Sequence, residues 1–410
     1  MTKLEELIKE LCPNGVARKK IKDEYTRLRG TPITAGKMKE IENSNGDIKI
    51  FAGGKTVINA FEKDIPNANI TRVPAVLVQS RGVIDAVYYD KPFTFKNEMW
   101  AYTAENVVSV KYLYYVLKNN MDYFRSAASG MGSLPQISLG VTEDFQIPVP
   151  PIPVQEEIVR ILDSFTELTA ELTTELTVRK KQYEYYRDKL LTPSSSIEWI
   201  SLGEIATVTK LAGFEFTNFV KYSDNGKIIA LRGLNVKNGR LDLSDVKYID
   251  GSDFGKLSRS KLKIGDMLFT YVGTVGQVAL VDENDKYYLA PNVALIRLNT
   301  ANVLPKFMMY YFQTNTFWDS QIGKLLQSSS MQNIPMEKIR KFRLPLIPLE
   351  IQNKIVQVLD NFDSICSDLK IGLPAEIEAR KKQYAFYRDK LLSFKETPTY
   401  EQKKEISKTE

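Results

Sequence analysis

The chain has 410 residues, of which 43% are apolar and 26% charged, as in water-soluble proteins large enough for two or three domains. It has no histidine and two cysteines, Cys12 and Cys366, which excludes the usual zinc sites and Ser-His-Asp triads and favours unpaired thiols. No apolar run is long enough to span a membrane and no signal-peptide pattern is present, so we expect a cytoplasmic protein without membrane contact or bound metal.

Residues 1–150 are predicted to form a first mixed α/β domain. A short amphipathic helix over residues 3–11 ends at a Pro-Asn-Gly run, because these residues interrupt helical hydrogen bonding. Apolar residues recur at steps of three and four over Ser109–Met121, which predicts another helix. Short β-rich runs between Gly, Asn and Pro predict strands at 47–51 and 75–79.

A long spacer helix is predicted over residues 151–192, where the pattern changes to a heptad seam. The seam consists of Ile158, Leu162, Phe165, Leu172, Leu176, Tyr183, Tyr186 and Leu190. A single helix of this length cannot bury its apolar stripe alone, so it needs a partner helix.

Residues 193–347 are predicted to form a second mixed α/β domain. Within it, Lys263–Thr270 is typical of a turn that leads into a buried strand. The following segment, Val272–Leu280, is predicted to be a glycine-punctuated hairpin, and Val76–Ile84 is its looser counterpart in the first domain.

A second spacer helix is predicted over residues 348–394, and Gly372-Leu373-Pro374 is expected to kink or break it. Its seam consists of Ile355, Leu359, Phe362, Ile365, Leu369, Tyr384, Tyr387 and Leu391. The two spacer helices can therefore pair antiparallel and bury each other's stripe. The charged tail over residues 395–410 is predicted to be disordered.

The sequence contains an internal duplication. Arg179–Leu191 (RKKQYEYYRDKLL) returns as Arg380–Leu392 (RKKQYAFYRDKLL), with eleven of thirteen positions identical at an offset of 201 residues. Upstream, Gln155–Phe165 aligns with Gln352–Phe362 at an offset of 197. Each copy is a mixed domain followed by a proline-rich exit and a helix, so we predict an α+β fold with a pseudo-twofold internal repeat.

The net charge of +6 belongs mainly to the two domains. Residues 1–150 carry 20 Lys and Arg against 17 Asp and Glu, and residues 193–347 carry 19 against 14. The central helix carries 6 against 8. This distribution suits domains that contact a polyanion and helices that contact protein.

No catalytic constellation is found in the sequence. Gly53-Gly54-Lys55-Thr56 ends like a phosphate-binding loop, but the required first glycine would fall at Lys49. The Asn-Pro-Pro-aromatic motif of amino-methyltransferases is also missing, because Pro150-Pro151 follows valine and precedes isoleucine. These absences indicate a binding protein and not an enzyme.

Four sequence features together are highly specific. They are the two proline-rich exits with their helices (IPVPPIPVQEEIVRILDSF and LPLIPLEIQNKIVQVLDNF), the two RKKQY repeats, the GLPAEIEARKKQY join at 372–384 and the TAEL-like units at 169–176. Through them the chain resembles the specificity (S) subunit of type I restriction-modification systems over nearly its whole length. Ser80-Arg81-Gly82 departs from the fuller VGTVG pattern of the second domain, so the family's functional residues cannot be assigned to single positions of the first domain.

The resemblance implies two target recognition domains that read the halves of a bipartite, asymmetric sequence in double-stranded DNA. They would be separated by two long helices paired as an antiparallel coiled coil. The subunit itself would be non-catalytic and without a cofactor. It would dock two modification (methyltransferase) subunits, which use S-adenosylmethionine to methylate adenine, and restriction (motor and nuclease) subunits, which use ATP and Mg. The TAEL-like units would set the gap between half-sites, because four residues add about 6 Å to a helix.

Candidate contacts are polar or aromatic residues of the predicted loops and strands. For DNA they are Lys37, Lys39, Lys55, Arg72 and Arg81 in the first domain, and Lys210, Arg232, Asn235, Lys237, Tyr271, Thr274 and Gln277 in the second. The loops Ser129–Gln136 and Gln327–Asn333 are candidates for facing DNA or the spacer. Candidates for subunit docking or spacer packing are Tyr183, Tyr186, Arg187, Tyr384, Tyr387 and Arg388.

Two other functions remain open at this point. The first is a coiled-coil scaffold whose globular ends bind other proteins. The second is a single-chain nuclease-methyltransferase, against which the missing catalytic motifs weigh.

Overall fold

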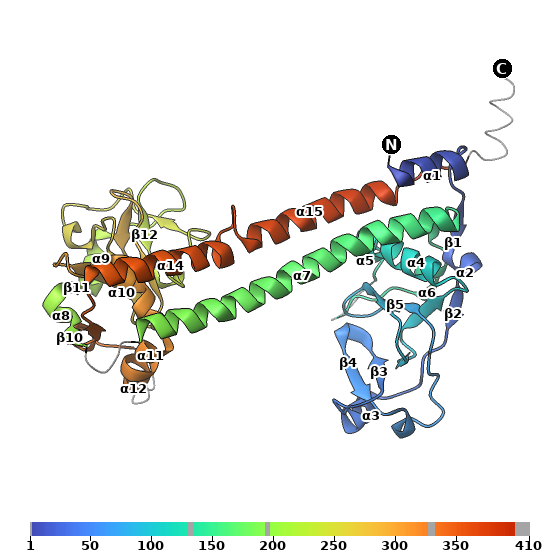
Figure 1. Cartoon of the computed structure of the whole chain (residues 1–410), viewed down its shortest axis with the longest axis horizontal. Helices are drawn as coiled ribbons and strands as arrows, with labels where there is room; N and C mark the ends of the chain where they lie inside the picture. Colours follow the sequence, from blue (N-terminus) through green and yellow to red (C-terminus); the bar gives the residue numbers. More distant parts are fainter. Residues whose placement is uncertain (1, 130–133, 193–196, 327–332, 398–410) are drawn as a thin grey trace, which may run out of the picture. The chain divides into compact units, whose positions relative to one another are not determined.

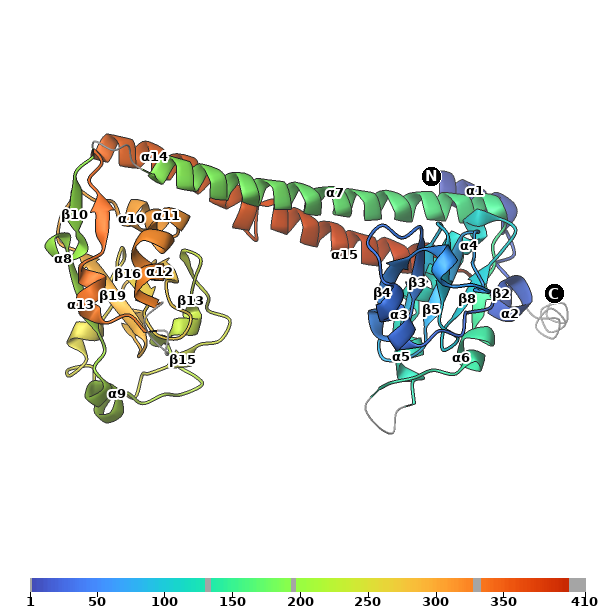
Figure 2. The same ribbon diagram turned by 90° about the horizontal axis from the view of Figure 1, so that it is seen from below.

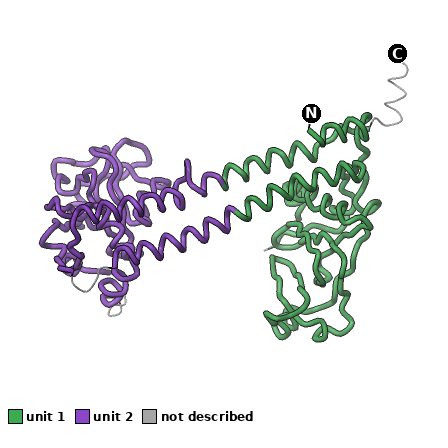
Figure 3. Tube along the Cα trace, in the orientation of Figure 1, with its two compact units in different colours: residues 1–171, 377–410 green, residues 172–376 purple. Residues whose placement is uncertain are grey.

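The computed structural model describes residues 2–129, 134–192, 197–326 and 333–397 (Figures 1 and 2). The chain divides into two compact units (Figure 3). The first unit combines residues 1–171 with 377–410, and the second consists of residues 172–376. Each unit holds one mixed α/β domain and a segment of each spacer region.

Three small sheets are found among the described residues of the domain in the first unit. The four-stranded sheet has the order β2-β8-β5-β6, the three-stranded sheet has the order β4-β3-β7 with β3 and β7 parallel, and β1 pairs with β9. The strands are β1 (Arg18–Lys20), β2 (Thr26–Leu28), β3 (Ile48–Phe51), β4 (Val57–Ala60), β5 (Ala75–Gln79), β6 (Asp85–Tyr89), β7 (Phe93–Phe95), β8 (Trp100–Thr103) and β9 (Gln146–Pro148). The strands predicted at 47–51 and 75–79 are confirmed as β3 and β5.

The helices of this domain are short except for α4. They are α1 (Lys3–Leu11), α2 (Ile21–Glu24), α3 (Ala35–Ile41), α4 (Val107–Asn119), α5 (Met121–Ser126) and α6 (Leu139–Glu143), with 3₁₀ turns η1 (Gly53–Lys55) and η2 (Glu62–Asp64). The predicted helices over 3–11 and 109–121 are confirmed as α1 and α4. α4 begins two residues early because the Asn106 side chain accepts a hydrogen bond from the Val108 N–H (2.8 Å) and caps the helix.

The second unit repeats these sheets with longer loops. Its strands are β10 (Trp199–Ser201), β11 (Ala206–Lys210), β12 (Ile229–Leu231), β13 (Val236–Lys237), β14 (Arg240–Leu241), β15 (Lys247–Tyr248), β16 (Met267–Thr270), β17 (Val278–Leu280), β18 (Tyr287–Leu289), β19 (Val293–Leu298) and β20 (Arg343–Pro345). Its helices are α8 (Leu202–Ile205), α9 (Gly213–Phe219), α10 (Pro305–Phe312), α11 (Asn315–Phe317), α12 (Gly323–Leu326) and α13 (Met336–Arg340), with η3 (Gly233–Asn235), η4 (Ser258–Ser260) and the π-helical η5 (Trp318–Ile322). The hairpin predicted over 272–280 is confirmed only in part: β17 is its second strand, but the first strand is β16, and residues 271–277 form the loop between them.

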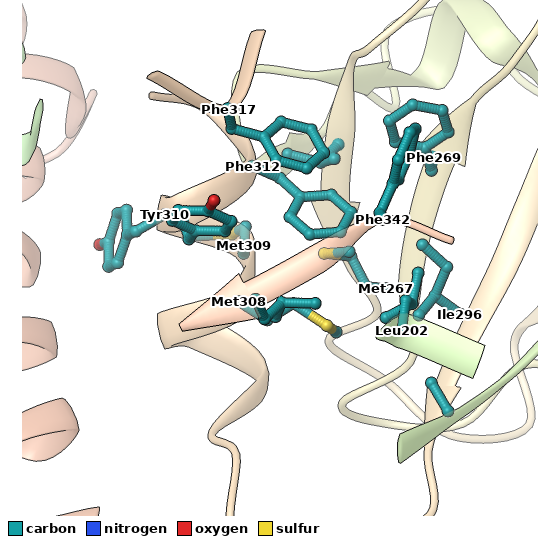
Figure 4. Packing of buried hydrophobic residues seen from close by; sticks show 14 of the residues in the cluster. Leu202, Met267, Phe269, Ile296, Met308, Met309, Tyr310, Phe312, Phe317 and Phe342 are labelled. Atoms are coloured by element: carbon teal, nitrogen blue, oxygen red, sulfur yellow. The ribbon is translucent and has the colours of Figure 1, made fainter. Parts of the chain in front are cut away.

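Aromatic rings fill the core of the second unit (Figure 4). Phe312 and Phe317 are stacked with ring centroids 4.2 Å apart, and Phe342 meets both rings edge-on. Phe269 of β16 completes the group at 5.7 Å from Phe342. Such pairs add attraction beyond the burial of their area, and here they fix α10 and α11 to the sheet.

Every described strand of the first domain has a counterpart in the second. The sheet order β2-β8-β5-β6 returns as β11-β19-β16-β17, and β4-β3-β7 returns as β15-β12-β18 with the same parallel pair. The pair β1-β9 returns as β10-β20. The second unit adds the two-stranded hairpin β13-β14, to which no strand pair described in the first unit corresponds. The duplication seen in the spacer sequences therefore extends through both domains.

The long helices pair within each unit. α7 (Ile152–Leu191) is continuous, whereas the C-terminal spacer consists of α14 (Leu349–Ser367) and α15 (Leu373–Leu391). In the first unit α7 runs antiparallel to α15 (Figure 2). Phe165 of α7 stacks on Tyr387 of α15 with ring centroids 5.5 Å apart. In the second unit α7 runs antiparallel to α14, and Tyr186 stacks on Phe362 at 5.7 Å. Phe165 is equivalent to Phe362 in the repeat, and Tyr186 is equivalent to Tyr387. Each stack therefore joins the phenylalanine of one copy to the tyrosine of the other.

The predicted break near Gly372 is confirmed. The carboxylate of Asp368 accepts hydrogen bonds from the backbone N–H groups of Lys370 (2.7 Å) and Ile371 (3.2 Å), which closes a turn after α14. At Gly372 a Cβ atom would lie 2.5 Å from the carbonyl oxygen of Ser364, so only glycine fits this close approach.

Parts of the predicted seam and tail are wrong. Leu369 is 80% exposed because it lies in the break, and Leu191 replaces Leu190 as the buried residue because the end of α7 enters the core of the second unit. Residues 395–397 are not disordered: the Val16 N–H donates to the Lys395 carbonyl (2.8 Å), and Glu396 pairs with Arg18 (2.6 Å). The rest of the tail, 398–410, lies outside the described residues.

Candidate nucleic-acid interface

The second unit contains an open cleft of about 810 Å³. Its wall combines η3 and β13, the loop between β16 and β17, and the middle of α9 with the segment that follows it. Four of the residues predicted to contact DNA line it, namely Arg232, Lys237, Thr274 and Gln277. Phe216, Tyr222, Asn238 and Asn292, which sequence reasoning missed, line it as well. Cationic, amide and hydroxyl groups beside aromatic rings are the groups that contact phosphates and base edges.

Each cation of the cleft already has a carboxylate partner. Arg232 donates to Asp245 (2.8 Å), and Lys237 lies 2.7 Å from Asp242. The hydrogen bond from Lys237, with others from Ser244, holds the pKa of Asp242 well below its usual range. The Nε of Arg232 is buried and has no partner in the described part of the chain, so one of its donors is unused. A polyanion would therefore compete with two carboxylates for these cations.

The loop between β16 and β17 is held by its own backbone. The Thr270 hydroxyl donates to the Thr274 carbonyl (2.5 Å), which leaves the Thr274 side chain exposed at the tip. The Gln277 amide oxygen accepts from the Asn238 N–H (3.1 Å) and ties this loop to the β13-β14 turn. Gly276 is required because a Cβ there would come within 2.5 Å of the Trp318 ring. The predicted polar residues thus sit on a rigid loop.

The structure contradicts the prediction that Asn235 contacts DNA. Its side chain is fully buried, and its amide donates to the carbonyl oxygens of Asp242 (2.8 Å) and Asp245 (2.7 Å). Asn235 therefore shapes the cleft wall from behind and is not available to DNA. Tyr271 is only 8% exposed, and Lys210 lies 5.7 Å over its ring, so Tyr271 supports that lysine instead of facing solvent.

In the first unit the structure brings Lys55 and Arg81 to one place. The Gly54 N–H donates to the Arg81 carbonyl (3.2 Å), so the η1 turn lies against the loop between β5 and β6. Both cationic side chains are exposed. This loop occupies the position of the Thr274 loop, because Arg81 pairs with Gln136 as Val272 pairs with Asn333. The intervening loop residues 130–133 and 327–332 lie outside the described residues.

The other three candidates of the first unit lie on different elements. Lys37 and Lys39 are on the exposed face of α3, where Lys37 pairs with Glu40 (2.8 Å). Arg72 precedes β5 and pairs with Glu62 (2.5 Å). Their role as DNA contacts stays a prediction, as it does for the residues of the cleft.

The repeat residues of the spacer join the helices to their domains. Arg187 is buried beside Asp188 (3.2 Å) and lies 5.5 Å over the Tyr183 ring. Arg388 repeats this arrangement 5.7 Å over Tyr384 and also donates to Asn119 of α4 (2.6 Å). Burial raises the pKa of both tyrosines to about 12. These four residues are therefore packing residues within the chain.

The exposed part of the repeat is aromatic. Tyr186 and Tyr387 are 41% and 40% exposed although each stacks on a phenylalanine. Their neighbours Tyr185 and Phe386 are 59% and 65% exposed, and the prediction missed them. Aromatic side chains exposed at equivalent positions of a repeat are typical of protein-binding surfaces and could have been found from the repeat alignment.

Two further searches covered the described residues. They contain no group of three or more His, Cys, Asp or Glu arranged to hold a metal ion. None of the helices in the described ranges has the length and apolar character needed to cross a bilayer.

Comparison with known proteins places these features in context. A family model described as "Type I restriction modification DNA specificity domain" matches residues 28–179 and 195–379. The specificity subunit of the Escherichia coli type I restriction enzymes EcoR124I and EcoR124II is 30% identical over 366 residues, covering 86% of this chain and 88% of the relative.

Two solved structures share the fold. The S subunit of a type I restriction-modification system from M. genitalium aligns with a TM-score of 0.55 at 15% identity, covering 92% of this chain and 94% of that one. A chain from a structure concerned with complex assembly and conformational transition of the type I R-M system aligns with a TM-score of 0.56 at 14% identity, covering 93% and 98%.

Proposed function

Because the chain belongs to the family of type I restriction-modification specificity subunits, we propose that each of its two domains reads one half of a bipartite, asymmetric DNA sequence. Members of this family recognise DNA and are non-catalytic, and partner subunits carry out the chemistry. A single-chain nuclease-methyltransferase is therefore wrong for this chain. A scaffold without a role in DNA recognition is also wrong.

The observation that carries the proposal is the duplicated loop with different side chains. The β5-β6 loop of the first unit offers Arg81, and Lys55 lies beside it. The equivalent β16-β17 loop of the second unit offers Thr274 and Gln277. Two domains with one topology and different polar groups would read two different short sequences, which makes the complete target asymmetric.

Phosphate contacts and base contacts would come from different residues. Lys237 of β13 and Lys55 of η1, which are both exposed, would contact phosphates and supply salt-dependent attraction. Gln277 and Arg232 have the amide and guanidinium groups that pair with adenine and guanine edges. The exposed hydroxyl of Thr274 can pair with either.

We further propose that the subunit docks two modification subunits at its two equivalent aromatic surfaces. Specificity subunits of type I systems act with methylase and restriction subunits. Tyr185 with Tyr186, and Phe386 with Tyr387, form one exposed aromatic pair in each unit, which supports one docking site in each. The partners would hold S-adenosylmethionine for adenine methylation, and ATP with Mg for cleavage.

The test is single-molecule sequencing of adenine methylation in cells that carry this chain and its modification subunit. We expect a two-part motif with a fixed unread gap. The double variant Thr274→Ala with Gln277→Ala should relax only one half of the motif, and the matched double variant Lys55→Ala with Arg81→Ala should relax only the other. Absence of a motif, or a change of the same half by both variants, would refute the proposal.

A further inference from the structure

The β13-β14 hairpin of the second unit fills a groove between an edge strand and two helices. The Gly239 N–H at its tip donates to the Val278 carbonyl of β17 (2.8 Å), the last strand of its sheet. A Cβ on Gly239 would come within 3.0 Å of Gln313 and 3.2 Å of Met309, which form the floor of the groove near the end of α10. Arg240 then forms an ion pair with Asp363 of α14 and donates to the Ser367 carbonyl (3.3 Å).

The described part of the first unit has the same groove without the hairpin. Ala86 of β6 is equivalent to Val278 of β17. Ala86 pairs with Val78 of β5 as Val278 pairs with Phe269 of β16, and β5 and β16 are equivalent strands. The repeat likewise aligns Tyr114 and Lys118 of α4 with Met309 and Gln313. These surfaces enclose an open groove of about 410 Å³ between β6, α4 and α7. The internal duplication therefore shows what kind of element fits there: a short turn that ends in an arginine.

The lining of this groove favours a basic protein segment over nucleic acid. It contains three carboxylates and two lysines, and each lysine already has a partner: Lys118 pairs with Asp85 (2.6 Å), and Lys111 with Asp163 (2.7 Å). Glu167 is exposed at the rim and has no cationic partner among the described residues. Phosphates would be repelled by this excess of negative charge, whereas a lysine or arginine would pair with Glu167.

The walls suit a polypeptide turn in two further ways. Tyr88 and Tyr114 lie with their rings 6.3 Å apart and offer a partly exposed aromatic wall. β6 is the edge strand of its sheet, and the Ala86 N–H donates to the neighbouring Asp85 carboxylate (2.9 Å). An edge strand can bind the backbone of an incoming turn, as β17 binds Gly239.

We infer that this groove of the first unit docks a basic turn of the modification subunit, in the position that the β13-β14 hairpin occupies in the second unit. The identity of the partner rests on the proposed function. The inference adds a contact that only one of the two units can make, so the two modification subunits would be held differently.

The test uses the purified complex of the full chain with its modification subunits. A photo-crosslinking benzoylphenylalanine replaces Tyr88 in the groove wall or, as the control, Tyr123, which is 49% exposed on α5 of the same unit. We expect a crosslink from position 88 to the modification subunit, mapped by mass spectrometry to a turn that contains lysine or arginine, and none from position 123.

A charge-reversal pair tests the chemistry. Glu167→Lys should lower the crosslink yield from position 88 about fivefold, whereas Glu171→Lys, one helical turn further along α7 and outside the groove, should leave it unchanged. No crosslink at position 88, a crosslink to a turn without basic residues, or equal effects of both substitutions would overturn the inference. If the complex still methylates its two-part motif in that case, the proposed function stands. A complex that neither forms nor methylates would overturn both.

Discussion

One substitution beside the cleft of the second unit, Asp242→Asn, should strengthen DNA binding. Lys237 is held by Asp242 at 2.7 Å, so a phosphate must displace this carboxylate to reach the lysine. Asp242→Asn removes the charge but keeps the Oδ1 atom that accepts from the Ser244 N–H (3.1 Å) and hydroxyl (2.6 Å). The turn should therefore keep its shape while one cation is released.

The magnitude follows from counterion release. In the unmodified protein a phosphate bound by Lys237 frees the Asp242 carboxylate, which takes up a cation and offsets the counterion release. In Asp242→Asn this offset is absent, which steepens the dependence of log affinity on log salt concentration by about 0.9. Between 50 and 200 mM salt, Asp242→Asn should therefore lose about 3.5-fold more affinity than the unmodified protein, and it should bind more tightly at the lower salt.

The assay is fluorescence anisotropy of a labelled target duplex with the full chain and its modification subunits, at four or five salt concentrations. The control is Glu283→Gln, which releases Lys286 from an equivalent ion pair (2.6 Å) in the same unit but outside the cleft. A slope that does not change in Asp242→Asn, or changes equally in the control, would refute a phosphate contact at Lys237.

Three other outcomes follow from the helices and their contacts. Deleting Thr173–Leu176 should shorten the unread gap by one or two base pairs, since four residues span about 6 Å of helix against 3.4 Å per base pair. Sequencing of methylation should show unchanged half-sites, and altered half-sites would contradict the idea that the length of α7 sets the gap. Gly372→Ala should lower the free energy of unfolding by roughly 1–3 kcal/mol in chemical denaturation, because its Cβ would overlap the Ser364 carbonyl, and an unchanged value would show that the turn can shift. Hydrogen bonds from Arg160, and then from Lys3, lower the pKa of Glu157 from 4.5 to about 2. The stability that these bonds add to the folded chain is therefore complete above pH 4.5 and is lost as the pH falls toward 2. Melting temperatures of Glu157→Gln should depend less on pH in that range than those of the unmodified protein, and parallel curves would argue against the assignment.

Local patterns were enough to predict the long helices and a few of the strands. The steps of three and four that predicted α4 and α7 come from the burial of one helical face, and the run 75–79 is buried along its whole length as β5. The break near Gly372 also follows from local chemistry. These features depend on neighbours within a few residues, which a single sequence displays directly.

The wall of the cleft depends on longer-range contacts. Asn235 was expected to face DNA, but its amide closes a loop with the carbonyls of Asp242 and Asp245, seven and ten residues later. Only the fold shows that these groups converge. The Asn238-Gly239 turn was a usable signal that the prediction overlooked, because Asn-Gly between short β-forming runs favours a hairpin.

The seam was predicted with a single stripe, whereas α7 has two sets of neighbours. Its first half packs on α4 and α15, and its last turn enters the core of the second unit through Leu191. A heptad repeat assumes one partner along the whole helix, so it selected Leu190 instead.

The continuity of α7 restricts which changes in its length the protein can accept. Each added residue rotates everything beyond it by about 100° around the helix axis, so one or two extra residues would turn the following contact face away from α14. Four residues leave a rotation of only about 40°, and seven leave about 20° in the opposite sense. The two adjacent four-residue units at 169–176 fit this rule. Naturally occurring spacers of different length should therefore differ by four or seven residues, which keeps the angular phase of the helix nearly constant while its length changes.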